Sequence, residues 1–258
     1  AGGVALNCVA NGKILKEKLY KNIWVQPASG DAGGSIGAAY ALWFEKYSSI
    51  RKITEFDTMQ GSYLGPSFDE DQIKNSLDDI GAKYKILDNQ QLLTSTAREL
   101  ADGKAIGWFQ GNMEFGPRSL GNRSILADPR NVNMQKNLNL KVKYRESFRP
   151  FAPAIIREEL ENWFDLKIDS PYMLFVSNVL QKHCLDMSED EKKLFGIDKL
   201  NIKRSNIPAV THVDYSARIQ TVHKETNDKF HSLIKEFFKL TNCPILVNTS
   251  FNIRGEPI

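Results

Sequence analysis

The sequence is poor in cysteine and has no long apolar run. Its 258 residues include three cysteines, Cys8, Cys184 and Cys243, without a CxxC pair. Disulfide frameworks and zinc knuckles use paired or closely spaced cysteines, so neither is indicated. No stretch of 18 apolar residues is present, which argues against a membrane span. We therefore expect a globular protein in a reducing, cytoplasmic setting, without a membrane partner.

The few histidines give no metal-binding pattern. The four of them (His183, His212, His223 and His231) show no spacing typical of metal ligands. We interpret His231 as a structural residue of an apolar helix. His212 precedes Arg218 by six residues, and this pair fits a binding role and a structural role equally well.

Positive charge is unevenly distributed. The chain carries 34 basic and 31 acidic residues, a net charge of +3. Residues 116–151 hold eight basic and two acidic residues, or +6, which leaves 3 − 6 = −3 for the rest. One basic block in a mildly acidic chain indicates a local anionic ligand more than general polyanion binding.

Hydrophobic periodicity predicts an α/β protein. Apolar residues of the segment 225–241 recur at i, i+3, i+4, i+7 and i+8, which predicts a core-packed helix. The segment 51–66 has no periodicity and reads as a linker. Residues 1–15 are expected to form a glycine turn followed by a short helix that stops at Asn11–Gly12. Further helices are expected over 31–49, 68–81, 90–103 and 131–142, and strands over 23–29, 83–87, 104–109, 124–127, 150–156, 173–179, 217–222 and 243–251.

Three stretches carry residues suited to anion chemistry. The first, residues 114–130, places three arginines among glycine and proline turns that a plain loop does not need. The second, 141–153, has cations that can hold phosphate or carboxylate oxygens. The third, 246–252, runs from an apolar strand into short polar side chains, where open α/β sheets often bind ligands. The candidates are Arg118, Lys143, Arg145, Arg149, Asn248, Ser250 and Asn252, with Arg123 and Arg130 left open, since either could instead pair with Asp128 or another carboxylate.

Other interpretations of these residues stay open. The basic cluster could be a solvated face, or a nucleic-acid groove with bases stacked on Phe115, Tyr144, Phe148 or Phe151. The low overall charge disfavours nucleic acid as a partner. Asp31, between a predicted strand and a helix with small residues in its first turns, could bind a cation or serve as an N-cap.

Six ordered motifs resemble a known family. They are "AGGVALNCVANGKIL", "VQPASGDAGGSIGAA", "FGPRSLGNRSILADPR", "KVKYRESFRPFAP", "THVDYSARIQTV" and "LVNTSFNIRGEPI". Together they resemble the O-carbamoyltransferase family of nodulation-factor and antibiotic biosynthesis. The resemblance covers nearly the whole chain, and six motifs in one order are far more specific than any one of them.

The resemblance implies two domains and a division of labour. Residues 1–50 are similar to the end of an actin-like ATPase-fold domain, 51–66 are the linker, and 67–258 resemble a YrdC-like domain with a twisted mixed sheet. The YrdC-like domain would form carbamoyl adenylate from carbamoyl phosphate and ATP. The actin-like domain would transfer the carbamoyl group to a hydroxyl of a sugar or another small molecule. We therefore expect a fragment that forms the adenylate at most, without completing the transfer.

The resemblance also implies roles for single residues. The family's Lys-x-Arg motif matches Lys143 and Arg145, and its Ser-x-Asn motif matches Ser250 and Asn252. Asp31 falls where the actin-like domain carries an aspartate ligand to iron, with the remaining ligands in sequence absent here. Mg²⁺ is expected with ATP. Arg118, Lys143 and Arg145 are the expected catalytic residues, and substrate contacts extend to Arg149, Arg218, His212, Asn248, Ser250 and Asn252.

Two other functions remain possible on the sequence alone. A free-standing carbamoyl- or threonylcarbamoyl-adenylate synthase would share the second half, but it would not need the actin-like segment. An RNA-binding module would use the basic block without catalysis, and the salt dependence of binding would identify it.

Overall fold

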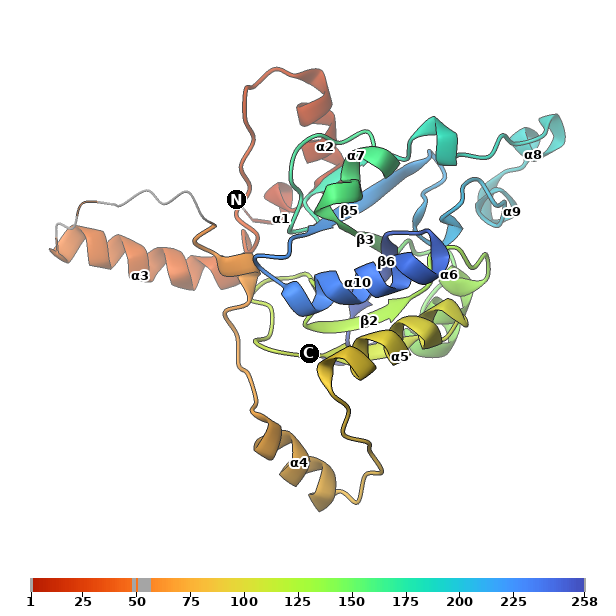
Figure 1. The fold of residues 1–258 in the computed structure, drawn as a ribbon. Coiled ribbons are helices and arrows are strands. Elements are labelled where there is room, and N and C mark those ends of the chain that lie inside the picture. The colour runs from red at the N-terminus through yellow and green to blue at the C-terminus, as the bar shows by residue number, and fades with distance from the viewer. Residues whose placement is uncertain (1, 48–49, 51–56, 258) are drawn as a thin grey trace.

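A six-stranded mixed sheet forms the centre of the computed structural model, which describes residues 2–47, 50 and 57–257 (Figure 1). The spatial order of the strands is β1-β2-β6-β3-β5-β4. β3 and β5 pair in parallel and every other neighbouring pair is antiparallel. The strands are β1 (Ile106–Phe109), β2 (Arg123–Ala127), β3 (Ala152–Ile156), β4 (Phe175–Asn178), β5 (Ser216–Val222) and β6 (Ile245–Ser250). The predicted mixed α/β class is confirmed.

Two helices cover one face of this sheet, α5 (Asn89–Ala101) and α10 (Asp228–Thr241) (Figure 1). The apolar stripe of α10 is buried as predicted, with Phe230, Leu233 and Phe237 fully inside. Asn227 caps α10, because its side chain accepts a hydrogen bond from the backbone N–H of Phe230 at 3.1 Å. Strands β2 and β3, which lie on either side of β6, are buried along their whole length, so the core lies between the sheet and these helices.

The first helices differ from the sequence prediction. After α1 (Gly2–Ala5), α2 (Cys8–Glu17) runs straight through Asn11–Gly12, where the sequence predicted a stop. Asn11 donates from Nδ2 to the carbonyl oxygens of Ala5 (2.8 Å) and Leu174 (3.1 Å). A Cβ on Gly12 would lie 2.2 Å from the carbonyl oxygen of Val176 on β4. The glycine therefore permits helix–sheet contact here and does not end the helix.

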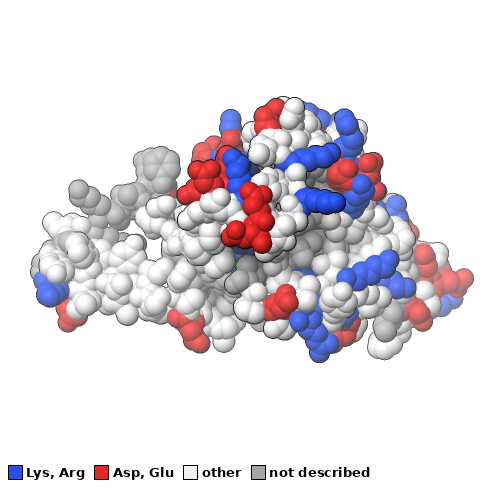
Figure 2. All heavy atoms as spheres, turned by 90° about the horizontal axis from the view of Figure 1, so that it is seen from below, with Lys and Arg blue, Asp and Glu red and all other residues white. Residues whose placement is uncertain are grey.

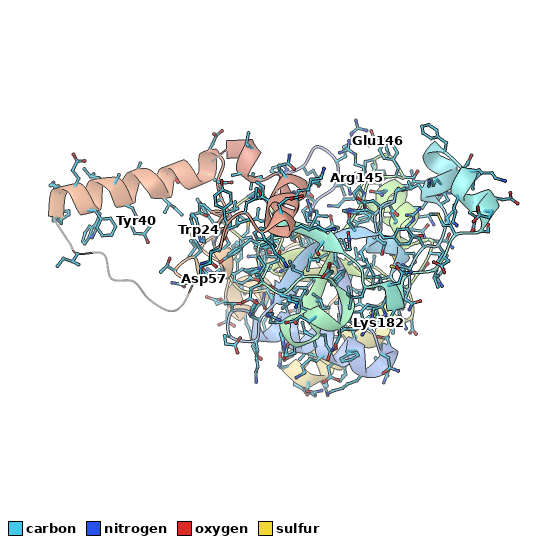
Figure 3. The ribbon with its side chains drawn as sticks, turned by 90° about the horizontal axis from the view of Figure 1, so that it is seen from above. Trp24, Tyr40, Asp57, Arg145, Glu146 and Lys182 are labelled. Carbon is cyan, nitrogen blue, oxygen red and sulfur yellow. The ribbon has the colours of Figure 1, made fainter. Side chains whose placement is uncertain are left out.

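Helix α3 (Asp31–Tyr47) forms an arm that leaves the body of the molecule (Figures 1 and 3). It confirms the predicted helix as far as Tyr47, and residues 48 and 49 lie outside the described part. None of its residues is buried, and Tyr40 stands exposed on the arm in Figure 3. The linker prediction falls partly on residues 51–56, which are outside the described part, and continues through a turn and the 3₁₀ helix η1 (Gln60–Ser62).

Two predicted strands do not form. Residues 23–29 are irregular and then a turn, and residues 83–87 connect α4 (Glu70–Asp79) to α5 with mostly exposed side chains. Both are short apolar runs that find no partner strand within the described ranges, so their backbone stays unpaired. α4 itself begins as predicted, with a capping box between Asp69 and Gln72.

Short helices connect the remaining strands. The predicted helix over 131–142 consists of α6 (Met134–Asn137) and the π-helical turn η2 (Leu138–Val142). The other short helices are η3 (Arg157–Glu159), α7 (Leu160–Trp163), η4 (Gln181–His183), α8 (Glu189–Lys193), α9 (Gly196–Leu200) and η5 (Pro208–Val210). No helix in the described part of the chain is long and apolar enough to cross a membrane.

Charges of both signs alternate on the face seen from below (Figure 2). Lysine and arginine side chains there lie beside aspartate and glutamate, without a broad area of one sign. This face does not offer the continuous positive surface that a nucleic-acid groove requires.

Candidate functional site

Four arginines from distant parts of the chain line one pocket of about 240 Å³. They are Arg118, Arg145, Arg149 and Arg218, and we call their site the arginine pocket. Arg118 follows the Gly116–Pro117 turn, Arg145 and Arg149 precede β3, and Arg218 lies on β5. The rest of the lining is Pro117, Ser119, Pro150, Phe151, Ala152, Met173, Asn248, Thr249 and Ser250, so it contains no carboxylate.

Arg218 is held in the pocket without an acidic partner. Burial lowers the pKa of its guanidinium to about 10, and the nearby Arg118 adds to the effect. Its Nε and the Nε of Arg118 are both buried without a hydrogen-bond acceptor in the described part of the chain. Buried donors without acceptors are costly, so an anion that accepts from them would be strongly favoured.

Arg145 and Arg149 are partly engaged with their neighbours. Arg145 donates from Nε to Oδ1 of Asn139 at 2.6 Å and lies with its guanidinium carbon 5.0 Å from the ring centroid of Phe151. Burial lowers the pKa of Arg145, and the positive charge of Arg149 lowers it further. Arg149 donates to Glu146 at 2.8 Å in an exposed ion pair, and Figure 3 shows Glu146 beside Arg145. The guanidinium of Arg145 is therefore oriented by Asn139 and Phe151, and that of Arg149 by the exposed carboxylate of Glu146.

Lys143 lies next to the pocket but is not part of its lining. Its ammonium donates to the carbonyl oxygens of Ser250 (2.5 Å) and Asn252 (2.7 Å), and lies 3.0 Å from both Ser250 Oγ and Asn252 Oδ1. Burial, and then the charge of Arg145, lowers the pKa of Lys143 to about 8. Lys143 thus joins the Lys-x-Arg motif to the Ser-x-Asn motif, and its ammonium lies among four protein oxygens.

The polar residues at the end of β6 belong to the same network. Asn248 is buried and donates to Gln220 Oε1 (2.7 Å) and the carbonyl of Ser119 (3.2 Å). Ser250 donates to Asn252 Oδ1 at 2.6 Å. Asn248 and Ser250 line the pocket, whereas Asn252 does not line it and contacts it through its hydrogen bond with Ser250.

His212 faces a different pocket. It lines a space of about 530 Å³ together with Val9, Asp214 and Ser216, and its Nδ1 lies 3.0 Å from Ser216 Oγ. Burial lowers its pKa, with Asp214 acting in the opposite sense. His212 and Arg218, which the sequence had paired, therefore line different pockets, although the charge of Arg218 still contributes to lowering the pKa of His212.

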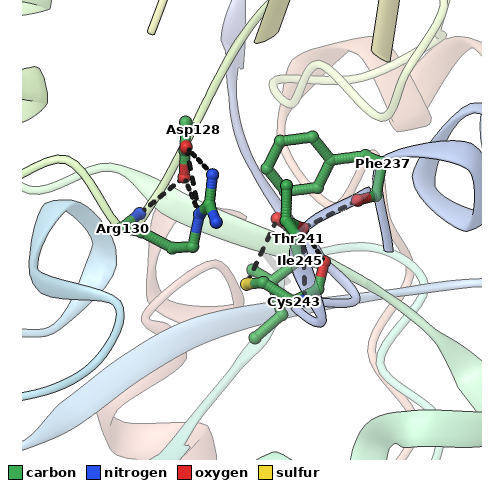
Figure 4. A network of polar contacts seen from close by, with 6 residues as sticks. All are labelled: Asp128, Arg130, Phe237, Thr241, Cys243 and Ile245. Atoms are coloured by element: carbon green, nitrogen blue, oxygen red, sulfur yellow. Dashed lines mark hydrogen bonds and ion pairs between the residues drawn. The ribbon is translucent and has the colours of Figure 1, made fainter. Parts of the chain in front are cut away.

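The two arginines left open by the sequence have structural partners. Arg123 is buried, and its guanidinium donates to four carbonyl oxygens and stacks 3.6 Å from the ring centroid of Phe109. Arg130 forms a two-pronged contact with Asp128 at 2.6 to 3.1 Å, beside Phe237 (Figure 4). Of the three arginines in residues 114–130, only Arg118 reaches the pocket.

Asp31 does not assemble a metal site with its neighbours. It is the exposed first residue of α3. Within residues 2–47, 50 and 57–257, no group of three His, Cys, Asp or Glu side chains could hold a metal ion. An iron site therefore cannot be built from the residues described here, and a role for Asp31 as a ligand remains a prediction.

Sequence reasoning missed two residues that shape the site. Glu114 is buried and accepts hydrogen bonds at one oxygen from the backbone N–H groups of Leu120, Asn122 and Arg123. Asn139, also buried, orients Arg145. Glu114 stands directly before the glycine-rich turns, and this position was the only sign that it could act on the loop.

Comparison with known proteins agrees with the motif pattern. The model of the carbamoyltransferase C-terminus matches residues 97–258, and that of the carbamoyltransferase N-terminus matches residues 1–40. An uncharacterised protein of Synechocystis, sll1178, is 54% identical over the whole chain and 42% of its own length. Nodulation protein NolNO of Sinorhizobium fredii is 40% identical over the whole chain and 35% of its own length. Nodulation protein NolO of Bradyrhizobium diazoefficiens is 39% identical over the whole chain and 43% of its own length.

The chain spans about two fifths of the length of these curated relatives. The C-terminal family model covers more than half of the chain and includes every arginine of the pocket. The chain therefore belongs to the carbamoyltransferase family.

Proposed function

We propose that this chain forms carbamoyl adenylate in the arginine pocket, as part of an O-carbamoyltransferase. In this proposal residues 67–258 are a YrdC-like domain, and residues 1–50 are the end of an actin-like domain that passes the carbamoyl group to a hydroxyl of a small molecule. The net reaction consumes carbamoyl phosphate, ATP and one water, and releases phosphate and pyrophosphate beside the adenylate.

The charge of the pocket is the observation that supports this proposal most. Carbamoyl phosphate and ATP bring several negative charges into one space, where they would repel each other. Four guanidinium groups without a carboxylate in the lining would offset that repulsion. Arginine's planar fork can bind two oxygens of one phosphate, so the four groups can also fix the orientation of the reacting phosphorus.

Each cation would have its own task. Arg118 and Arg218, with buried Nε groups lacking acceptors, would bind the most deeply seated phosphate. Arg149 would leave Glu146 when the anion arrives, because that ion pair is exposed and weak. Lys143 would act as a positioning residue that keeps Ser250 at the pocket wall.

Magnesium and iron would have different places in this scheme. Mg²⁺ would enter with ATP, held by phosphate oxygens and water, since the pocket lining has no carboxylate ligand. Iron would belong to the actin-like part of the longer protein, where Asp31 would be one ligand.

Calorimetric titration of carbamoyl phosphate into the protein tests the role of the pocket. We expect Arg118→Ala and Arg218→Ala each to weaken binding at least tenfold, because each removes a charge-assisted hydrogen bond worth about 1.5–3 kcal/mol. Arg98→Ala removes an exposed arginine of α5 and serves as the control. Equal affinities for all four proteins would contradict the proposal.

A further inference from the structure

A buried carboxylate shapes the loop that carries Arg118. Residues 114–123, called here the arginine loop, turn back on themselves around Glu114. One oxygen of Glu114 accepts from the backbone N–H groups of Leu120 (2.6 Å), Asn122 (2.9 Å) and Arg123 (3.3 Å). Glu114 is therefore an internal anchor of the loop, and Ser119, the residue after Arg118, adds a second internal bond from its Oγ to the carbonyl of Arg123 at 2.8 Å.

A second anchor comes from the segment that follows α3 in the chain. The backbone N–H of Phe115 donates to the carbonyl of Ser62 at 2.6 Å, and Ser62 Oγ donates back to the carbonyl of Phe115 at 2.8 Å. The hydroxyl of Tyr63 donates to the carbonyl of Leu120 at 2.8 Å. Both ends of the turn that contains Arg118 are thus hydrogen-bonded to neighbouring residues of the 57–66 segment.

Tyr63 is itself fixed by the core. Its hydroxyl accepts a hydrogen bond from Nδ2 of Asn227, the N-cap of α10, at 2.9 Å. Burial raises the pKa of the Tyr63 phenol, so the hydroxyl stays protonated and continues to donate to Leu120. The phenol therefore remains available as a donor across the physiological pH range.

The turn before α3 touches the same loop. A Cβ on Gly116 would lie 3.4 Å from the carbonyl oxygen of Pro27 and 3.5 Å from Cβ of Ala28, which is buried. Gly116 has φ +140°, a conformation that favours glycine. The turn that leads into Asp31 and the loop that carries Arg118 therefore lie so close together that a methyl group on Gly116 would touch both Pro27 and Ala28.

We propose that Tyr63 is a positioning residue for anion binding and that it acts through Arg118. By holding Leu120 while Ser62 holds Phe115, it fixes the turn between them and aims the guanidinium into the arginine pocket. Because Gly116 lies close to Pro27 and Ala28, the same loop would connect the part of the chain matching the family's N-terminus with the pocket. The inference rests on the proposed anion-binding function of the pocket.

Pyrophosphate binding by the protein, measured by calorimetry, tests this role. We expect Tyr63→Phe to weaken binding about three- to tenfold, since one hydrogen bond contributes about 0.5–1.5 kcal/mol. Tyr84→Phe is the matched control, because it removes a tyrosine hydroxyl bonded to Asp78 on exposed α4. Ser62→Ala removes the bond from Oγ of Ser62 to the carbonyl of Phe115 and leaves the backbone bond between the two residues. It should also weaken pyrophosphate binding, so it tests the inference even if Tyr63→Phe fails to fold.

A double-mutant cycle separates positioning from a general structural role. In an Arg118→Ala background, Tyr63→Phe should have no further effect on the dissociation constant, because the group that it aims is gone. The same loss in both backgrounds, or no loss in either, would overturn the inference. Failure of the unmodified protein to bind pyrophosphate would instead count against the proposed function.

Discussion

At the scale of the residue, the cations near the pocket differ in what surrounds them. Arg118 and Arg218 have buried nitrogen atoms that find no acceptor among the described residues, whereas Arg123 and Lys143 donate to protein oxygens on every side. A cation without a protein acceptor is available to a ligand, and a saturated one supports the structure. The presence or absence of protein acceptors therefore marks Arg118 and Arg218 as candidates for ligand binding, and Arg123 and Lys143 as structural cations, although all four carry the same charge.

Lys143 should make stability depend on pH. Its pKa is lowered to about 8 in the folded protein, whereas an unfolded lysine titrates near about 10.4. Between these values the unfolded chain binds more protons at this position, so the free energy of unfolding rises with pH. Between pH 8 and 10, the free energy of unfolding should therefore rise more steeply with pH in the unmodified protein than in Lys143→Met. Below pH 7 the two proteins should have the same pH dependence.

Urea unfolding of both proteins at pH 7 and pH 9.5 measures this difference. A pH dependence that is identical with and without the lysine would show that its proton is not released in the folded state over this range.

Glu146 should compete with the ligand for Arg149. Their exposed ion pair must open before the guanidinium can bind an anion. Glu146→Gln should therefore tighten pyrophosphate binding about two- to fivefold at low salt, as expected for an exposed pair. Glu161→Gln, an exposed glutamate of α7, changes the net charge equally and should have less effect. Equal gains in both variants would indicate a general charge effect and would contradict the competition.

Much of the candidate site could be predicted from single residues, but their partners could not. Arg118, Arg145 and Arg149 were named from turns and spacing, and Arg218 only as a companion of His212; the structure brings all four into one pocket. His212 was named as well, yet it faces another pocket because Ser216 and Asp214 hold its side of the β5 turn. The buried oxygens that saturate Lys143 come from residues more than a hundred positions away, and no local pattern reveals them.

At the scale of the element, long periodic segments were predicted well and short apolar runs were not. The stripe of α10 defines a helix by itself, because five apolar residues between positions 230 and 238 repeat at helical spacing. Residues 83–87 have the composition of a strand, but an isolated run of five residues needs a partner that the sequence cannot name. The prediction that the helix stops at Gly12 was wrong for the same reason, because the glycine allows α2 to approach β4, a contact far away in the sequence.

The contact between α2 and β4 can be tested with two glycines. Gly12→Ala would force a Cβ against the carbonyl of Val176, so we expect the free energy of unfolding to fall by about 1–3 kcal/mol. Gly37→Ala in α3 meets no atom within 4 Å and should raise it by about 0.5–1 kcal/mol through helix propensity. Chemical unfolding of both variants checks this pair. A neutral Gly12→Ala would mean that α2 does not pack closely on the sheet.

At the scale of the whole molecule, the order of the strands creates the pocket. β6 lies between β2 and β3, and β5 pairs with β3, so the segments around residues 118, 149, 218 and 249 converge although the chain separates them widely. Strand order depends on long-range pairing that hydrophobic periodicity does not encode. The family resemblance supplied what the periodicity lacked, and the comparisons confirm that family.

The central claim is that the arginine pocket forms carbamoyl adenylate. The most direct measurement is the conversion of ATP to AMP and pyrophosphate by the protein, with and without carbamoyl phosphate, beside Arg118→Ala and the Arg98→Ala control. We predict AMP and pyrophosphate only when carbamoyl phosphate is present, with the product lost in Arg118→Ala and retained in Arg98→Ala. Absence of carbamoyl-phosphate-dependent AMP from folded protein, or full activity of Arg118→Ala, would contradict the account.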